Sequence, residues 1–335
     1  MIAIYVTSSV KGAGKTTLCA GLGKKFLGSG KKVGFFKPVL TGSQNPNMAG
    51  IQSDAEFMKR LFGLTDSVDR LCPVYSDENS LSSRVKLAYD QIAAGKDIVL
   101  IEGVDGSGQI SREVAAKLDA RVMAVVDYSQ EPAKSVTGYK DFGSSLLGVV
   151  VNKVPQNQKE RLLDELCTLL GSEVTILGML PEERTLLALD VNELAGAIQG
   201  ELVADAAPVA GLVENVMLGA LAVDPGPLYF GRKANKAVVL KSERPDMQMA
   251  ALQTSVTCLV LTGSTPPKSF ILEMAREKKV PIILTKGDVA TTVTKIEDIL
   301  GKTGFNPESK LPRLNEILGQ HFSFPTFYQK LGLAS

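Results

Sequence analysis

The chain has 335 residues, a length that allows about two domains. Its hydrophobic content of 44% and charged content of 22% are typical of a globular protein with well-filled cores. A net charge of +1, the absence of tryptophan and an aromatic content of 6% exclude a strongly basic or base-stacking surface, so we expect no nucleic-acid partner. No apolar run is long enough to cross a bilayer, so we expect no membrane partner.

The cysteines also limit the kind of protein. Cys19, Cys72, Cys167 and Cys258 are widely separated, with neither metal-type spacing nor the density of a disulfide framework. We therefore expect each of them to be a small buried apolar residue, in a protein of the reducing cytoplasm.

The amino-terminal stretch contains the strongest functional pattern. An apolar run over residues 1–7 predicts a strand, the polar segment Ser8-Ser9-Val10-Lys11-Gly12-Ala13-Gly14-Lys15-Thr16-Thr17 follows, and then an apolar helical pattern begins. The order of strand, glycine-rich loop and helix is the one that a phosphate-binding loop requires.

The chemistry of this loop suits a nucleotide, although Ser9 stands where the full pattern has glycine. Gly12 and Gly14 allow the backbone to turn and to direct N–H groups inward, and the helix N-terminus adds partial positive charge. Lys15 is expected at the β- and γ-phosphates and the Thr16 hydroxyl at Mg²⁺. The residues expected to contact the nucleotide here are Gly12, Ala13, Gly14, Lys15, Thr16 and Thr17.

Strands and helices alternate through the rest of the first half. Strands are predicted over 33–36, 97–101, 121–126, 146–151 and 174–177, and helices over 54–62, 81–94, 111–118, 130–141 and 159–170. Nearly continuous apolar strands indicate a parallel sheet buried on both faces. The predicted fold class is α/β, a doubly wound, mostly parallel P-loop domain with a second, smaller α/β domain.

Several polar residues are placed where they could share one site with Lys15. Lys37, Glu102 and Asn152 each follow a predicted strand, and Asp54 opens a predicted helix. Ligands of doubly wound sheets bind at the carboxyl ends of the strands, so these side chains could converge there.

Each of these residues has a plainer alternative role. Glu102 is the leading Mg²⁺ ligand, but a strand-end acid can also face solvent. Asp54 is either a second metal ligand or a helix N-cap, and Lys37 is either a site residue or a solvated lysine. Asn152 either reads an adenine edge or is a turn residue.

The second half predicts a shorter α/β series after a candidate linker at 200–208. Helices are predicted over 213–221, 247–253, 270–278 and 289–300, and strands over 237–240, 258–261 and 281–284. The expected domains are residues 1–200, 209–302 and a carboxyl-terminal tail of 303–335, whose aromatic residues either pack within the domain or serve a dimer interface.

Six stretches of the first half together carry a family resemblance. They are Gly12-Ala13-Gly14-Lys15-Thr16, Phe36-Lys37-Pro38-Val39 with Thr41-Gly42, Ser53-Asp54-Ala55, Ile101-Glu102-Gly103, Gly148-Val149-Val150-Val151-Asn152-Lys153 and Gly178-Met179-Leu180-Pro181. In this order they resemble dethiobiotin synthetase, and also the synthetase-like amino-terminal region of some phosphotransacetylases. The resemblance covers roughly residues 1–187.

The resemblance implies specific roles. It implies ATP as the nucleotide, with Mg²⁺ on Thr16, Asp54 and Glu102. It also implies Lys15 at the transferred phosphate. The remaining roles that it implies are Lys37 and Thr41 at the acceptor pocket and Asn152 at the base.

A second resemblance lies in the other half. Tyr229-Phe230-Gly231-Arg232, Lys236-Ala237-Val238-Val239, Glu243-Arg244 and Leu259-Val260-Leu261-Thr262-Gly263-Ser264 resemble a DRTGG domain, with Glu243 and Ser264 replacing two signature residues. In those phosphotransacetylases this domain follows the synthetase-like region, and it is thought to be regulatory. We do not expect acetyltransferase activity from these 335 residues.

Two classes of function fit the pattern. The first is an ATP-dependent enzyme that activates a small oxyanionic substrate, a carboxylate or carbamate, with Lys15 and Lys37 as the catalytic residues. The second is a nucleotide-dependent regulatory or sensor protein that acts through the DRTGG-like domain or a homodimer interface.

Overall fold

The computed structural model describes residues 1–41, 48–104, 108–171, 173–204, 211–219, 226–300 and 308–333. The chain forms two compact units, one of Met1–Glu183 with Gly304–Ser335 and one of Arg184–Thr303. The first unit therefore includes the expected tail, and the second begins before the expected linker. None of the described helices is long and apolar enough to cross a membrane.

A six-stranded parallel sheet forms the centre of the first unit, with strand order β2-β5-β1-β6-β7-β8. The strands are β1 (Ile2–Thr7), β2 (Val33–Phe36), β5 (Ile98–Glu102), β6 (Arg121–Asp127), β7 (Leu146–Val154) and β8 (Ile176–Pro181). The three central strands β5, β1 and β6 are almost entirely buried, which explains their continuous apolar sequences. The predicted doubly wound class is confirmed.

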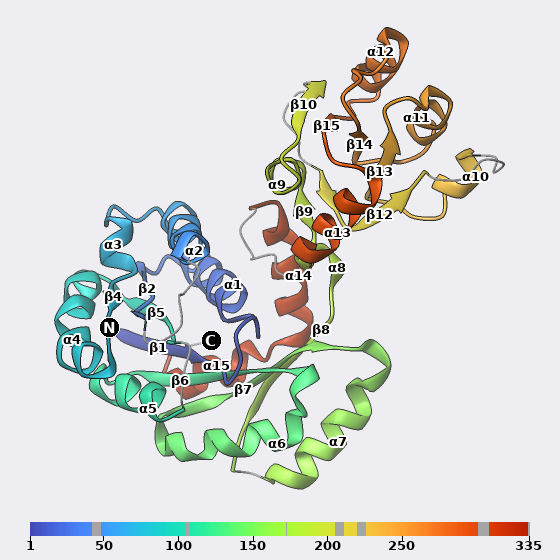
Figure 1. Ribbon diagram of the computed structural model, residues 1–335. Coiled ribbons are helices and arrows are strands. Elements are labelled where there is room, and N and C mark those ends of the chain that lie inside the picture. Colours follow the sequence, from blue (N-terminus) through green and yellow to red (C-terminus); the bar gives the residue numbers. More distant parts are fainter. Residues whose placement is uncertain are drawn as a thin grey trace. The chain divides into compact units, whose positions relative to one another are not determined.

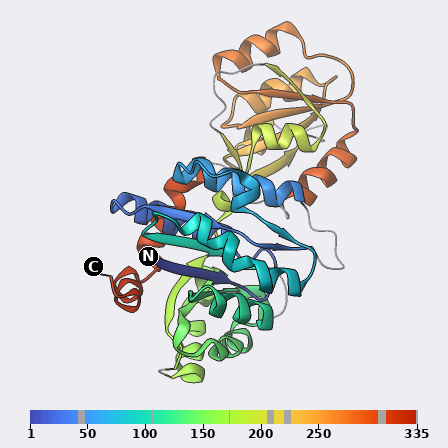
Figure 2. The same ribbon diagram turned by 90° about the vertical axis from the view of Figure 1, so that its left-hand side faces the viewer.

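Helices cover both faces of this sheet (Figures 1 and 2). They are α1 (Lys15–Gly28), α2 (Met48–Phe62), α3 (Val68–Leu71), α4 (Glu78–Ala93), α5 (Gly108–Lys117), α6 (Pro132–Thr137), α7 (Lys159–Leu170), α14 (Leu311–His321) and α15 (Phe324–Leu331). The short strands β3 (Val39–Leu40) and β4 (Val74–Tyr75) pair with each other, and 3₁₀ turns lie at η1 (Tyr128–Gln130), η2 (Gly138–Ser145), η3 (Gln156–Gln158) and η4 (Glu308–Lys310).

The returning segment 308–333 packs within the first unit. Phe322 forms an antiparallel bridge with Gly178 on the edge strand β8, and so covers an edge that would otherwise be open. Phe322 and Phe327 are buried, and the ring centroid of Phe327 lies 6.1 Å from that of Phe26 in α1. Of the two roles expected for the tail aromatics, packing within the domain is the one observed.

The second unit contains a five-stranded sheet in the order β10-β15-β14-β13-β12, parallel except at β10. Its strands are β10 (Glu201–Ala204), β12 (Asn215–Leu218), β13 (Lys236–Lys241), β14 (Cys258–Thr262) and β15 (Ile282–Thr285), beside a separate pair, β9 (Leu189–Asp190) and β11 (Leu212–Val213). Its helices are α8 (Arg184–Leu187), α9 (Val191–Ala197), α10 (Gly226–Phe230), α11 (Pro245–Leu252), α12 (Ser269–Glu277) and α13 (Val289–Leu300).

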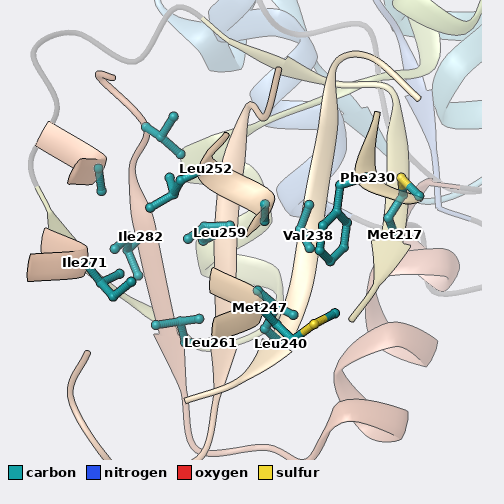
Figure 3. Close-up of a cluster of buried hydrophobic side chains, with 13 residues drawn as sticks. Met217, Phe230, Val238, Leu240, Met247, Leu252, Leu259, Leu261, Ile271 and Ile282 are labelled. Carbon is teal, nitrogen blue, oxygen red and sulfur yellow. The ribbon is translucent and has the colours of Figure 1, made fainter. Parts of the chain in front are cut away.

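Each face of this sheet has its own apolar core. Figure 3 shows the core under α10, α11 and α12, where Phe230, Met247 and Ile271 meet strand residues such as Val238 and Leu259. Residues of α9 and α13 pack against the opposite face. The second unit is therefore a smaller α/β layer structure, as expected.

Two predictions for the second unit are wrong. The segment predicted as a helix over 213–221 forms β11 and β12 as far as it is described, and residues 220 and 221 lie outside the described residues. Its apolar spacing fits either element, and the deciding contact is the parallel pairing of β12 with β13, which lies far away in sequence. In the candidate linker, residues 201–204 form strand β10, which pairs with β15, and residues 205–208 lie outside the described residues.

Two predictions for smaller features are also wrong. The helix expected over 54–62 begins at Met48, because Ile51 and Ala55 pack with Val39 and Cys72 and so outweigh the helix-weakening Gly50. Cys167 is exposed on α7, whereas the other three cysteines are buried as expected.

Candidate nucleotide-binding site

The loop between β1 and α1 has the geometry of a phosphate cradle. Gly12 and Gly14 have φ angles of +78° and +106°, in the left-handed region that favours glycine. A Cβ on Gly14 would also lie 2.3 Å from Asn152 Nδ2. Among the described residues no side chain caps α1 at Gly14, so the positive end of the helix faces the loop.

The Lys15 side chain folds back along this loop. Lys15 is 6% exposed, and its Nζ donates a hydrogen bond of 2.9 Å to Ser8 Oγ. Ser8 Oγ in turn donates to the Val10 carbonyl at 2.7 Å. The loop therefore holds a buried ammonium on its inner side, where a phosphate chain would pass.

A cluster of four side chains adjoins the start of α1. Lys37 Nζ lies 2.8 Å from Asp54 Oδ2 and 2.8 Å from Glu102 Oε1. Thr16 Oγ1 donates to the same Glu102 oxygen at 2.9 Å. The structure thus brings together Thr16, Lys37, Asp54 and Glu102, from α1, the end of β2, α2 and the end of β5, as the sequence predicted.

These contacts decide between some of the alternatives left by the sequence. Glu102 is 4% exposed, so it is not a solvent-facing acid, and Lys37 is an ion-paired side chain rather than a solvated one. Asp54 lies inside α2 and not at its first residue, so the helix N-cap alternative is wrong. Lys37 is directed at two carboxylates in this structure, and not at the acceptor side alone.

The cluster has a consistent electrostatic description. Burial raises the pKa of the Asp54 carboxyl; the Lys37 ammonium opposes this rise and the Glu102 carboxylate adds to it. Burial alone would lower the pKa of Lys37, but the Glu102 and Asp54 carboxylates outweigh it and raise that pKa. Lys37 therefore stays charged at neutral pH, and one positive charge is shared between two carboxyl groups.

Asn152 and Lys153 tie the end of β7 to the loop. Asn152 Nδ2 donates to the Ala13 carbonyl at 2.8 Å, and Lys153 Nζ donates to the Gly12 carbonyl at 2.9 Å. Asn152 pairs with Asp127 within the sheet, so the turn alternative for Asn152 is wrong. Its amide contacts the loop, and its expected role at the base stays a prediction.

Lys153 is the site residue that the sequence reasoning missed. Besides Gly12, its ammonium contacts Asp127 Oδ2 at 2.7 Å, and its backbone has a φ angle of +59°, which is unusual for a residue with a side chain. Burial alone would raise the pKa of Asp127, but hydrogen bonds from Lys153 and Ser129 outweigh it and lower that pKa below its usual value. The available signal was a lysine directly after the strand-end asparagine.

Thr41 is placed beside β4. Its hydroxyl and its backbone N–H both donate to the Tyr75 carbonyl, at 3.1 and 2.9 Å. Within the described part of the chain no hydrogen bond joins Thr41 to Lys37, so the expected role of Thr41 at the acceptor stays a prediction. Gly42, the next residue of that motif, lies outside the described residues.

The residues present fit a divalent cation. Mg²⁺ prefers hard oxygen ligands, and the Thr16 hydroxyl, Asp54 and Glu102 supply one hydroxyl and two carboxylates. Glu102 Oε2 is buried and accepts no hydrogen bond from the described residues, so it has a lone pair to offer. The described residues contain no group of three or more His, Cys, Asp or Glu side chains that could hold a metal ion, so nucleotide and water oxygens would have to complete such a site.

A parallel, doubly wound sheet with a glycine-rich loop after its first strand defines the class, a P-loop nucleotide-binding α/β domain. A family model described as an AAA domain (AAA_26) matches residues 3–188, more than half of the chain, and the chain belongs to this family. A second model, the DRTGG domain, matches residues 193–299. The expected order of a synthetase-like P-loop domain and a DRTGG domain is therefore confirmed.

Curated relatives agree with this architecture. Phosphate acetyltransferase of Nitrosomonas europaea is 26% identical over 325 residues, which cover 88% of this chain and 45% of that protein. The ATP-dependent dethiobiotin synthetase BioD of Caldicellulosiruptor saccharolyticus is 25% identical over 179 residues, 45% of this chain and 74% of that protein. The chain spans about half the length of the phosphate acetyltransferases that it matches.

Among solved structures, the cell division protein MinD of Aquifex aeolicus is similar to this chain, with 20% identity and a TM-score of 0.37. The similarity covers 56% of this chain and 85% of the MinD chain.

Proposed function

We propose that this protein binds Mg-ATP in the loop of residues 8–17 and uses it to activate a small oxyanion, a carboxylate or a carbamate. The observation that carries this proposal is the group of Thr16, Lys37, Asp54 and Glu102 beside the phosphate loop. Phosphoryl transfer needs little covalent chemistry from a protein; it needs positive charge and alignment at the γ-phosphate. This group offers one ammonium and the oxygen ligands that would hold Mg²⁺.

In this proposal the two lysines have separate tasks. The Lys15 ammonium binds the β- and γ-phosphates, and the Lys37 ammonium orients the acceptor oxyanion. An acceptor oxygen forms a bond to the γ-phosphorus while the bond from that phosphorus to the β–γ bridging oxygen breaks, which leaves ADP and an acyl phosphate. Thr16, Asp54 and Glu102 would hold Mg²⁺, which would neutralise charge on the phosphates.

The second candidate is a regulatory nucleotide-binding role without ligase turnover. It is supported by the DRTGG match over residues 193–299 and by the relatives named phosphate acetyltransferase, which this chain matches along most of its length. In that case ATP occupancy would alter the DRTGG unit or a homodimer interface. The four free cysteines agree with the expected cytoplasmic location in either case.

Product analysis with γ-labelled ATP tests the two candidates. The purified chain is incubated with Mg-ATP, with and without a panel of small carboxylic acids and carbamates, and label transfer and phosphate release are followed. Turnover that depends on an added acid supports the enzyme. Tight ATP binding with no acid-dependent turnover supports the regulatory role instead.

Lys15→Met and Lys24→Met serve as the matched pair for this assay. Both lysines belong to α1, but Lys15 is buried in the loop and Lys24 is exposed. We expect the first substitution to abolish ATP binding and the second to leave it unchanged. Binding that survives in Lys15→Met would contradict the proposal.

A further inference from the structure

The ammonium of Lys37 occupies a position that is suited to a metal ion. It lies 2.8 Å from an oxygen of Asp54 and 2.8 Å from an oxygen of Glu102, and the three side chains are 12%, 18% and 5% exposed. The Glu102 oxygen that it contacts is the one that accepts from Thr16 Oγ1. One buried cation thus bridges two of the three side chains that form the candidate Mg²⁺ site.

A divalent cation and this ammonium would need the same oxygens. Both are positive, so they repel each other strongly at ligand distance in a poorly solvated site. Only one of them can bridge Asp54 and Glu102. The two carboxylates carry more negative charge than one ammonium neutralises, and Glu102 Oε2 has no described partner, so the cluster still attracts positive charge.

The backbone at Lys37 leaves the side chain as the part that can move. The Lys37 N–H donates to the Leu71 carbonyl at 2.7 Å, and Pro38 follows with a fixed φ. A lysine side chain has a flexible stem of four carbons and a compact charge, so it can exchange one anionic partner for another without moving the main chain.

We propose that Lys37 is a displaceable cation: its ammonium pairs with Asp54 and Glu102 until a divalent metal ion takes those oxygens, and it is then free to turn to an anion bound at the phosphate loop. This inference rests on the proposed function of the same site. It reconciles the ion pairs of Lys37 with the acceptor-facing role that the sequence assigned to this residue. In this proposal, binding of the metal ion and release of the Lys37 ammonium from Asp54 and Glu102 occur together.

Metal affinity gives the first test, with Mn²⁺ alone as the probe and no nucleotide present. Electron paramagnetic resonance measures free Mn²⁺ in titrations of the wild type, Lys37→Met and Lys86→Met. Removing a competing cation should tighten Mn²⁺ binding about tenfold in Lys37→Met. Lys86 is the matched control, because its ammonium also pairs with a carboxylate, that of Asp90, but it lies on α4 outside the site, so its loss should leave the affinity within about twofold of wild type.

Reactivity of the Lys37 amine gives the second test, and it needs only the wild-type protein. Brief reductive methylation with isotopic formaldehyde, read by peptide mass spectrometry, reports how readily each lysine reacts. With saturating Mn²⁺ we expect the labelling of Lys37 to rise several-fold, while that of exposed Lys24 stays constant. This test stands even where Lys37→Met does not fold.

Three results would overturn the proposal: unchanged or weaker Mn²⁺ binding in Lys37→Met, unchanged Lys37 labelling at saturating Mn²⁺, or no Mn²⁺ binding to either protein. Glu102→Gln should lose both the Mn²⁺ site and the rise in labelling. Because no nucleotide is used, these results are independent of whether the protein binds or turns over ATP. A failed ATP assay would therefore count against the proposed function and not against the cation exchange.

Discussion

The two units of this chain share an architecture but differ in what they bury at the carboxyl ends of their parallel strands. In the first unit Lys15 and Glu102 are buried there, and Glu102 pairs with Lys37. In the second unit the buried polar residues described there are uncharged: the hydroxyls of Ser242, Thr262 and Thr285, and the amide of Gln248. Its fully buried lysine, Lys236, lies at the opposite end, where β13 begins.

Lys236 of the second unit and Lys37 of the first unit have different kinds of partner. Lys236 Nζ donates to two backbone carbonyls, those of Lys233 and Ser255, and so holds these two segments of the chain together. Burial lowers the pKa of Lys236. Lys37 bridges two carboxylates next to a glycine loop. Burying charge costs free energy unless it is paired, and natural chains accept that cost mainly at functional sites. The comparison therefore supports placing the proposed nucleotide chemistry in the first unit.

The largest expected effect on ATP affinity comes from adding one methyl group to the phosphate loop, and the same change in the second unit serves as the control. Gly14→Ala places a Cβ 2.3 Å from Asn152 Nδ2 at a φ of +106°, which should distort the phosphate loop and weaken ATP binding by at least about 100-fold. Gly263→Ala creates comparable backbone strain in the second unit, at a φ of +110° and 2.9 Å from Ser242 Oγ. Titration calorimetry with Mg-ATP measures both variants. Equal losses of affinity, or none in Gly14→Ala, would break the comparison.

A second pair of variants compares a loop-positioning lysine with a structural one. Lys153→Met removes the charged hydrogen bond to the Gly12 carbonyl and should weaken ATP binding about tenfold, with Lys153→Arg recovering part of it. Lys236→Met should lower the thermal midpoint of the second unit and leave ATP affinity within about twofold of wild type. The reverse pattern would show that Lys153 and Lys236 have been assigned to the wrong roles.

A smaller effect tests whether the returning segment belongs to the first unit. Gly21→Ala in α1 directs a Cβ to within 2.3 Å of Leu318 Cδ1 on α14, and overpacking of this kind should cost about 1–3 kcal/mol of unfolding free energy. Gly28→Ala, at the end of the same helix with no atom within 4 Å of its Cβ, is the control and should be neutral or slightly stabilising. Chemical denaturation measures both, and an unaffected Gly21→Ala protein would show that α14 does not pack there.

The smallest effect is a pH dependence at Asp127. Its pKa is lowered below the usual 3.8, since hydrogen bonds from Lys153 and Ser129 outweigh its burial. A lowered carboxyl pKa gives stability that is present above the unfolded-state value and is lost as the pH falls through the folded-state value. The stability lost in Asp127→Asn, about 1 kcal/mol at pH 6, should therefore begin to shrink below about pH 4 and disappear once the pH is below the folded-state pKa. A difference that stays constant from pH 6 to pH 3 would contradict this assignment.

The sequence predicts those parts of the site that depend on local order or on strand ends. The run from β1 through Gly14 to α1 is contiguous, and parallel strands place Glu102 and Asn152 at a common edge. Lys153 was missed because its role arises only when its Nζ reaches Gly12, a contact between residues far apart in sequence. The same reason explains β12, which was predicted as a helix and is fixed by pairing with β13, and the aromatic tail, which is fixed by Phe26. Pairing and packing across the chain outweigh local propensity at each of these points.

The central claim is that Lys15 and its loop bind the phosphates of ATP. Titration calorimetry of Mg-ATP into the wild type and into Lys15→Met tests it most directly. The account predicts saturable one-to-one binding to the wild type and no measurable heat of binding to the variant. Equal affinity in the two proteins would contradict it.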